Sequence, residues 1–212
     1  MTNHKLQRLC VVFIWLLCMR PAFSDDISFS SEKMSGRGNS NDVATVLSGN
    51  AIVQTADMKI KSDVIELSGK DFTRILARGS VEGENEKDQF SFSADVLQYD
   101  REKKISEFFG NVKFIDKKND TVVIGDYARY DEKSEILIIK FNVRITQNDK
   151  KCKAMFASYK RKSSLVELVG KPEVTDKDDT FRASRISINL DTDDIQLQGK
   201  VSGTIIEKEE HE

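Results

Sequence analysis

The sequence contains few of the residues on which most catalytic sites depend. Its 212 residues include 2 His, 3 Cys, 2 Pro and 1 Trp. Beyond residue 24 only Cys152, Pro172 and His211 remain of these types. A single thiol cannot form an internal disulfide, and without a usable His the chain lacks a Ser-His-Asp or Cys-His site. A zinc site would also lack its usual Cys and His ligands.

Other absences exclude further classes of function. The glycines are scattered singly, so no phosphate-binding loop is present. With 33 Lys and Arg against 35 Asp and Glu, the chain has no basic excess, which argues against a nucleic-acid partner. No pair of carboxylates stands in an apolar setting that would separate their pKa values. We therefore expect no enzyme, no cofactor and no metal, with an enzyme that acts through carboxylates as a remote alternative.

Residues 1–24 are predicted to be a cleavable secretory signal peptide. Lys5 and Arg8 precede an apolar run from Leu9 to Met19, and Ala22-Phe23-Ser24 supplies small residues three and one before Asp25. The run is short for a bilayer span, which needs about 20 residues. Cleavage removes three basic residues and no acidic one, which leaves 30 against 35 in an exported chain. An uncleaved membrane anchor is the alternative.

The glycines mark an internal repeat. Successive markers are separated by 30, 31, 60 and 29 residues: Gly49, Gly79, Gly110, Gly170 and Gly199. In the middle of the long gap Phe141-Asn142 takes the place of Gly-Asn. This spacing predicts about five repeats of roughly 30 residues.

Each marker opens a stretch with strict alternation of apolar and polar residues. In Gly110-Asn-Val112-Lys113-Phe114, the apolar residues lie two and four positions after the marker, with Lys113 between them. Period 2 is typical of strands with one buried and one wet face. No stretch has helical periodicity with caps. The sequence therefore predicts an all-β, antiparallel fold.

A small residue beside a short polar one follows most markers by 13 to 15 residues. These pairs are Ser62-Asp63, Ala94-Asp95, Gly125-Asp126 and Ala183-Ser184. Across these pairs the apolar residues change between even-numbered and odd-numbered positions. A β-bulge has this effect, because its extra residue bends the strand and reverses the facing of the side chains that follow. One unit departs from the pattern, because Lys160 and Lys162 occupy expected apolar positions. We expect that strand to be an edge or to be locally irregular.

These residues resemble the OstA-like, or LptA, family. The resemblance rests on Val46-Leu-Ser-Gly-Asn-Ala-Ile-Val53, on the later Gly-Asn-x-x-Val and Ala-Asp-x-x-x-Tyr blocks, and on the signal peptide. It implies an open, twisted β-jelly roll, which we place at residues 25–206. Residues 207–212 form a charged tail after it. The resemblance also implies a periplasmic protein that carries lipopolysaccharide, or a similar anionic glycolipid, between related inner- and outer-membrane partners by end-to-end assembly.

The predicted lipid-contact residues point to the inner face of the sheets. Alternation suggests Ala51, Val53, Ile60, Tyr99, Val112, Phe114, Leu137 and Ile139. The resemblance adds Ile27 and Phe29 of the first strand. That strand and the last one, Val201 to Ile206, are expected at opposite ends of the sheet stack, each with an unpaired edge through which copies join into an end-to-end homo-oligomer. The alternative is a structural or adaptor β-repeat protein of the cell envelope, with a dry core and no lipid ligand.

Overall fold

The computed structural model describes residues 26–39 and 42–206, so the predicted signal peptide and the tail at 207–212 lie outside the described residues. The described part contains 16 strands and two short 3-10 turns, η1 (Lys70–Phe72) and η2 (Arg161–Ser163). The strands are β1 (Ser28–Ser30), β2 (Lys33–Asn39), β3 (Asp42–Gln54), β4 (Lys59–Ser68), β5 (Arg74–Asn85), β6 (Phe90–Asp100), β7 (Ile105–Asp116), β8 (Thr121–Asp131), β9 (Ile136–Gln147), β10 (Lys150–Lys160), β11 (Leu165–Val169), β12 (Glu173–Asp176), β13 (Asp179–Arg182), β14 (Arg185–Asn189), β15 (Ile195–Gln198) and β16 (Ser202–Thr204).

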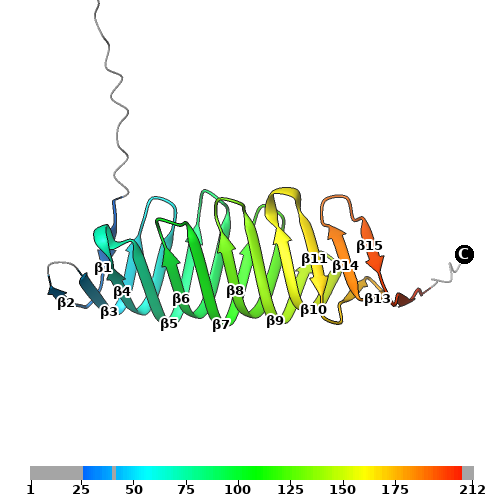
Figure 1. Ribbon diagram of the computed structural model, residues 1–212, viewed down its shortest axis with the longest axis horizontal. Helices are drawn as coiled ribbons and strands as arrows, with labels where there is room; N and C mark the ends of the chain where they lie inside the picture. Colours follow the sequence, from blue (N-terminus) through cyan, green and yellow to red (C-terminus); the bar gives the residue numbers. More distant parts are fainter. Residues whose placement is uncertain (1–25, 40–41, 207–212) are drawn as a thin grey trace, which may run out of the picture.

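All strands belong to one antiparallel sheet in which chain neighbours pair successively from β3 to β11. Figure 1 shows them following one another along the long axis, with β1 and β2 at one end and β13 and β15 near the other. The prediction of an all-β, open antiparallel β-jelly roll is therefore confirmed.

The long strands bend where the sequence predicts bulges. Register shifts occur at Ser62-Asp63, Ala94-Asp95 and Gly125-Asp126, and also at the Gly-Asn markers. Glycine is favoured at Gly110, because its φ is +71° and an added Cβ would press against the Asp95 carboxylate. The prediction of a bulge within one strand at Ala183-Ser184 is wrong. There the chain breaks into β13 and β14, which pair with different neighbours.

The bends divide the sheet into two facing layers. The β1 layer runs from β1 through the 51–54 half of β3 and the matching halves of β4–β10 to β12, β13 and β16. The β2 layer runs from β2 through the other halves to β11, β14 and β15. The layers pack through aromatic side chains, with ring centroids 4.9 Å apart for Phe92 and Phe108 and 5.0 Å apart for Phe90 and Tyr130.

The strand that carries Lys160 is not an edge. β10 pairs with β9 on one side and with β11 and β12 on the other. Lys160 is accommodated because it points outward, where its Nζ lies 3.0 Å from a carboxylate oxygen of Glu167. The expected local irregularity is confirmed, since β10 ends in the 3-10 turn η2, which contains the exposed Lys162.

Candidate lipid-contact face and assembly edges

Most of the residues predicted to contact lipid form the packed core between the layers. Eight of the ten are at most 2% exposed: Ala51, Val53, Ile60, Tyr99, Val112, Phe114, Leu137 and Ile139. Their inward orientation follows the predicted alternation, since Phe114 is 1% exposed while the preceding Lys113 is exposed on the outer face. An acyl chain would reach these residues only if the layers moved apart. Their contact with lipid remains a prediction.

The two remaining residues lie at the open N-terminal end of the β1 layer. Phe29 is aligned with the buried Val53 of β3, so both side chains lie on the inner face. Phe29 is nevertheless 43% exposed, because among the described residues β1 pairs only with β3. Ile27 is half-buried and packs against the core. The inner face is thus accessible to solvent at this end.

Opposite the bends, the turns of the two layers meet along a line that we call the mouth. Three groups of ion pairs cross it. Asp57 and Lys104 are 2.9 Å apart, Asp116 and Arg161 are 2.8 Å apart, and Lys150 binds Asp193. In each group one member comes from a turn or strand end of the β1 layer and the other from a turn of the β2 layer. These pairs tie the layers together on the side where the strands do not cross over.

The Asp116–Arg161 pair is the most buried group in the mouth. The two side chains are 0% and 3% exposed, and Asp116 also accepts hydrogen bonds from Tyr159 and Asn119 at 2.9 Å. The Arg161 guanidinium donates to the hydroxyl of Tyr130 at 2.9 Å. Burial raises the pKa of the Asp116 carboxyl, but the hydrogen bonds and charge of Arg161 outweigh it, so the pKa lies below its usual value.

Sequence reasoning missed this pair. Arg161 stands in the basic run of residues 150–162, which is usually read as a solvated surface. The alternation along the strand could have found Asp116, because it lies two residues after Phe114 and four after Val112, both of which face inward. A carboxylate at an inward position needs a buried partner. Nothing local in the sequence identifies Arg161 as that partner.

Both ends of the sheet stack carry exposed apolar side chains beside unpaired strand edges. At the N-terminal end Phe29 and Met34 are 43% and 60% exposed, and at the C-terminal end Val201, Ile205 and Ile206 are 54–71% exposed. Within the described residues, β1 and β2 pair only with β3, β15 pairs only with β14, and β16 pairs only with β13. The first and last strands therefore lie at opposite ends, as predicted. Unpaired edges of this kind can accept a further strand.

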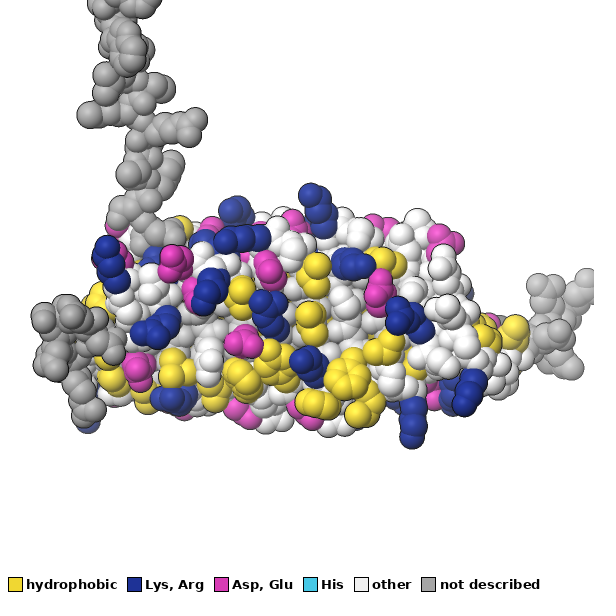
Figure 2. All heavy atoms as spheres, viewed as in Figure 1, with side chains coloured by type: hydrophobic (Ala, Val, Ile, Leu, Met, Phe, Trp, Pro, Cys, Tyr) yellow, Lys and Arg dark blue, Asp and Glu magenta, His cyan; other side chains and the backbone are white. Residues whose placement is uncertain are grey.

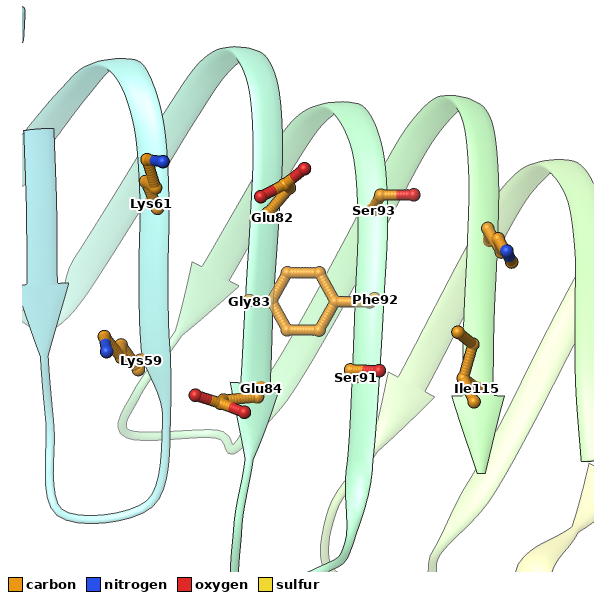
Figure 3. Close-up of a pocket in the computed structure, with 10 residues that line it drawn as sticks. Lys59, Lys61, Glu82, Gly83, Glu84, Ser91, Phe92, Ser93 and Ile115 are labelled. Carbon is orange, nitrogen blue, oxygen red and sulfur yellow. The ribbon is translucent and has the colours of Figure 1, made fainter. Parts of the chain in front are cut away.

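A depression on the outer face of the β1 layer is a less specific feature. It has a volume of about 420 Å³, and its lining includes Lys59, Lys61, Glu82, Glu84, Ser91 and Lys113. Figure 3 shows the Phe92 ring extending from β6 toward Gly83 of β5. A Cβ on Gly83 would clash with the Phe92 ring, so this glycine makes room for the aromatic side chain. Charges of both signs line the depression, which gives it no preference for one class of ion.

Cys152 is buried, and two carboxylates of the acidic turns are held in ion pairs. Cys152 is 3% exposed, and burial raises the pKa of its thiol to about 12. Asp176 and Asp193 both pair with Lys150. Within residues 26–39 and 42–206, no group of three or more His, Cys, Asp and Glu side chains is placed to hold a metal ion. The same residues contain no helix of the length and apolarity needed to cross a membrane.

Comparison with known proteins now decides the family. Residues 31–136 and 136–194 match the family model described as "LptA/(LptD N-terminal domain) LPS transport protein". The chain belongs to this family. The resemblance to OstA-like and LptA proteins is thereby confirmed, and the predicted role in lipopolysaccharide transport is confirmed at the level of the LptA/LptD N-terminal family.

No protein of the curated set matches the chain. Among solved structures, it is similar to the crystal structure of LptH, the LptA-homologous periplasmic component of the lipopolysaccharide transport device from Pseudomonas aeruginosa. The identity is 9% and the TM-score is 0.27, and the similarity covers 86% of this chain and 96% of that one.

Proposed function

We propose that this LptA/LptD N-terminal family member carries lipopolysaccharide, or a similar anionic glycolipid, across the periplasm. The acyl chains lie against the inner face, and the protein joins related inner- and outer-membrane transport proteins through its two sheet ends. The observation that carries this proposal is the state of those ends. Each has unpaired strand edges and exposed apolar side chains, and at the N-terminal end Phe29 continues the inner face.

The lipid enters where the inner face is already open. Acyl chains first meet Ile27 and Phe29, whose side chains face inward beside an unpaired edge. Deeper entry separates the two layers, because the remaining predicted contacts are at most 2% exposed. Separating the layers also breaks the ion pairs of the mouth, so these pairs add to the free energy that the separation requires. A longer β-strand assembly extends the inner face from one copy or partner to the next.

Assembly follows from β-augmentation at the edges of β1 and β2 at one end and of β15 and β16 at the other. Light scattering should detect oligomers of the mature chain that grow with concentration. Deleting residues 201–212 should shrink them, because the deletion removes β16 and the exposed Val201, Ile205 and Ile206. A strict monomer at high concentration would count against end-to-end bridging.

Export by a cleaved signal peptide is part of this proposal. N-terminal sequencing of protein recovered from cells should begin at Asp25, directly after the Ala22-Phe23-Ser24 site. Recovery of Met1 in the membrane fraction would instead identify residues 1–24 as an anchor.

The packed interior favours a second candidate function, a structural or adaptor β-repeat protein without a lipid ligand. Photo-crosslinking distinguishes the two. A crosslinker at Phe29 should label co-purified or added lipopolysaccharide, one at Phe114 should label it when the layers open, and one at the outward Lys113 should not. If neither inward position labels lipid, or if Lys113 labels as strongly, the structural role takes the place of lipid transport.

A further inference from the structure

A band of apolar side chains lies on the outer side of the bends, apart from the inner face and the sheet ends. Four large side chains are 37–47% exposed there: Ile124, Phe141, Met155 and Phe156. Figure 2 shows hydrophobic side chains gathered toward the lower edge of the face in view, over the middle strands. The outer side of a bent sheet is convex, so this band forms a ridge rather than a pocket.

The band continues across neighbouring strands in register. From β7 to β11 one outward row contains Phe109, Tyr127, Lys140, Phe156 and Val169. Ring centroids are 5.2 Å apart for Phe109 and Tyr127 and 5.6 Å apart for Phe141 and Phe156. With strands spaced by about 4.8 Å, the row is roughly 19 Å long. We call the four exposed side chains, with Phe109, Tyr127 and Val169, the bend patch.

Phe141 brings an aromatic ring to the outer side of a bend. Its φ is +62°, at a place where the other repeat markers carry glycine. Glycine adopts this left-handed conformation more easily than a bulky residue does. The chain nevertheless presents a 47% exposed phenyl ring here.

Cations surround the bend patch. Within two residues of the bends in β7–β12 there are five: Lys113, Lys140, Arg144, Lys153 and Lys171. The same span contains two carboxylates, Asp126 and Glu173, and a third, Glu107, accepts a hydrogen bond from the Tyr127 hydroxyl of the bend patch. Glu173 pairs with Lys153 and Arg182. This local excess of positive charge contrasts with the net charge of −2 for the whole chain.

We propose that the bend patch docks onto the surface of a bilayer rich in anionic phospholipid. Its aromatic and aliphatic side chains enter the boundary between headgroups and acyl chains, and the flanking cations face the lipid phosphates. The convex shape fits a deformable lipid interface, whereas small-molecule sites are concave. The bend patch is remote from the free strand edges, so strand addition does not explain it. This docking does not depend on whether a glycolipid is carried between the layers.

Vesicle co-sedimentation of the protein purified after expression of the full chain tests this proposal. One set of vesicles is phosphatidylcholine alone, and the other contains roughly one third phosphatidylglycerol. Phe141→Gly with Phe156→Ser removes the exposed rings while placing at 141 the residue that other repeat markers carry. Arg144→Gln with Lys171→Gln removes two flanking cations. Lys59→Gln with Lys61→Gln removes the same charge from the outer face elsewhere and is the matched control.

The wild-type protein and the matched control should bind the phosphatidylglycerol vesicles alike. The ring variant should bind about tenfold more weakly or worse, and the cation variant should bind several-fold more weakly, with a smaller response to salt. Circular dichroism and the urea midpoint verify that each variant folds. Equal binding to both kinds of vesicle, or unchanged binding by the ring variant, overturns the proposal. So does self-association that the ring variant abolishes while vesicle binding persists, because the occupant would then be a second copy.

Discussion

Removing the charge of Asp116 should destabilise this protein strongly, although the residue is distant from the sheet ends. Asp116→Asn keeps the size of the side chain but leaves the Arg161 guanidinium, 3% exposed, without its anionic partner. Breaking a buried ion pair in this way costs about 3–5 kcal/mol. A domain is usually stable by only about 5–15 kcal/mol, so the loss should be a large fraction of the total.

Urea unfolding followed by circular dichroism measures this loss. The midpoint for Asp116→Asn should fall while the slope stays the same, because the surface exposed on unfolding is unchanged. Glu167→Gln is the matched control. Its partner Lys160 lies 3.0 Å away in a half-buried pair on the outer face, and pairs at the surface are worth about 0–1 kcal/mol.

A double variant separates the charge effect from packing. Asp116→Leu with Arg161→Met removes both charges, and apolar replacement of a buried pair is often neutral. The double variant should therefore be more stable than the sum of its single changes predicts, by more than about 1 kcal/mol. Strict additivity, or a loss below about 1 kcal/mol for Asp116→Asn, would refute the reasoning.

The same pair predicts a pH dependence. Burial raises the pKa of Asp116, but the hydrogen bonds and charge of Arg161 lower it by more. The pKa in the folded protein therefore lies below the pKa in the unfolded chain. The contribution to stability is therefore complete above the unfolded pKa of about 3.9 and is lost as the pH falls through the folded value. The stability of Asp116→Asn should fall less steeply than that of the wild type in this acid range.

Three further predictions concern the core, a bend and the thiol. Phe114→Ala should cost about 3–5 kcal/mol of unfolding free energy in urea, whereas Phe29→Ala, at the open end, should cost far less; equal losses would show that burial is not the cause. Gly110→Ala should lower stability by at least about 1–2 kcal/mol because φ is +71°, while Gly36→Ala, with nothing within 4 Å, is the control expected to be near neutral. Cys152 should react slowly with a thiol reagent at pH 8 and quickly in urea, since burial raises its pKa to about 12; fast labelling of folded protein would contradict this.

Local patterns in the sequence determined the strands, their facing and most of the bends. Alternation placed Phe114 inward and Lys113 outward, because successive side chains of a strand necessarily point to opposite faces. The change of parity at Ala94-Asp95 marked a bulge for the same geometric reason. The spacing of Gly110 in the repeat was visible in the sequence, and its φ of +71° at a bend was seen only in the structure.

Only the tertiary structure decided which distant residues meet. Asp116 and Arg161 are 45 residues apart, and their contact depends on the stacking of successive hairpins and on the closure of one layer over the other. The same stacking turned Lys150 from a member of a basic run into a buried partner of Asp193, and it joined Phe141 to Phe156 in one exposed patch. Period and turn chemistry act within a few residues. The contacts between distant residues depend instead on how all the bent strands stack along the sheet, and no local pattern contains that information.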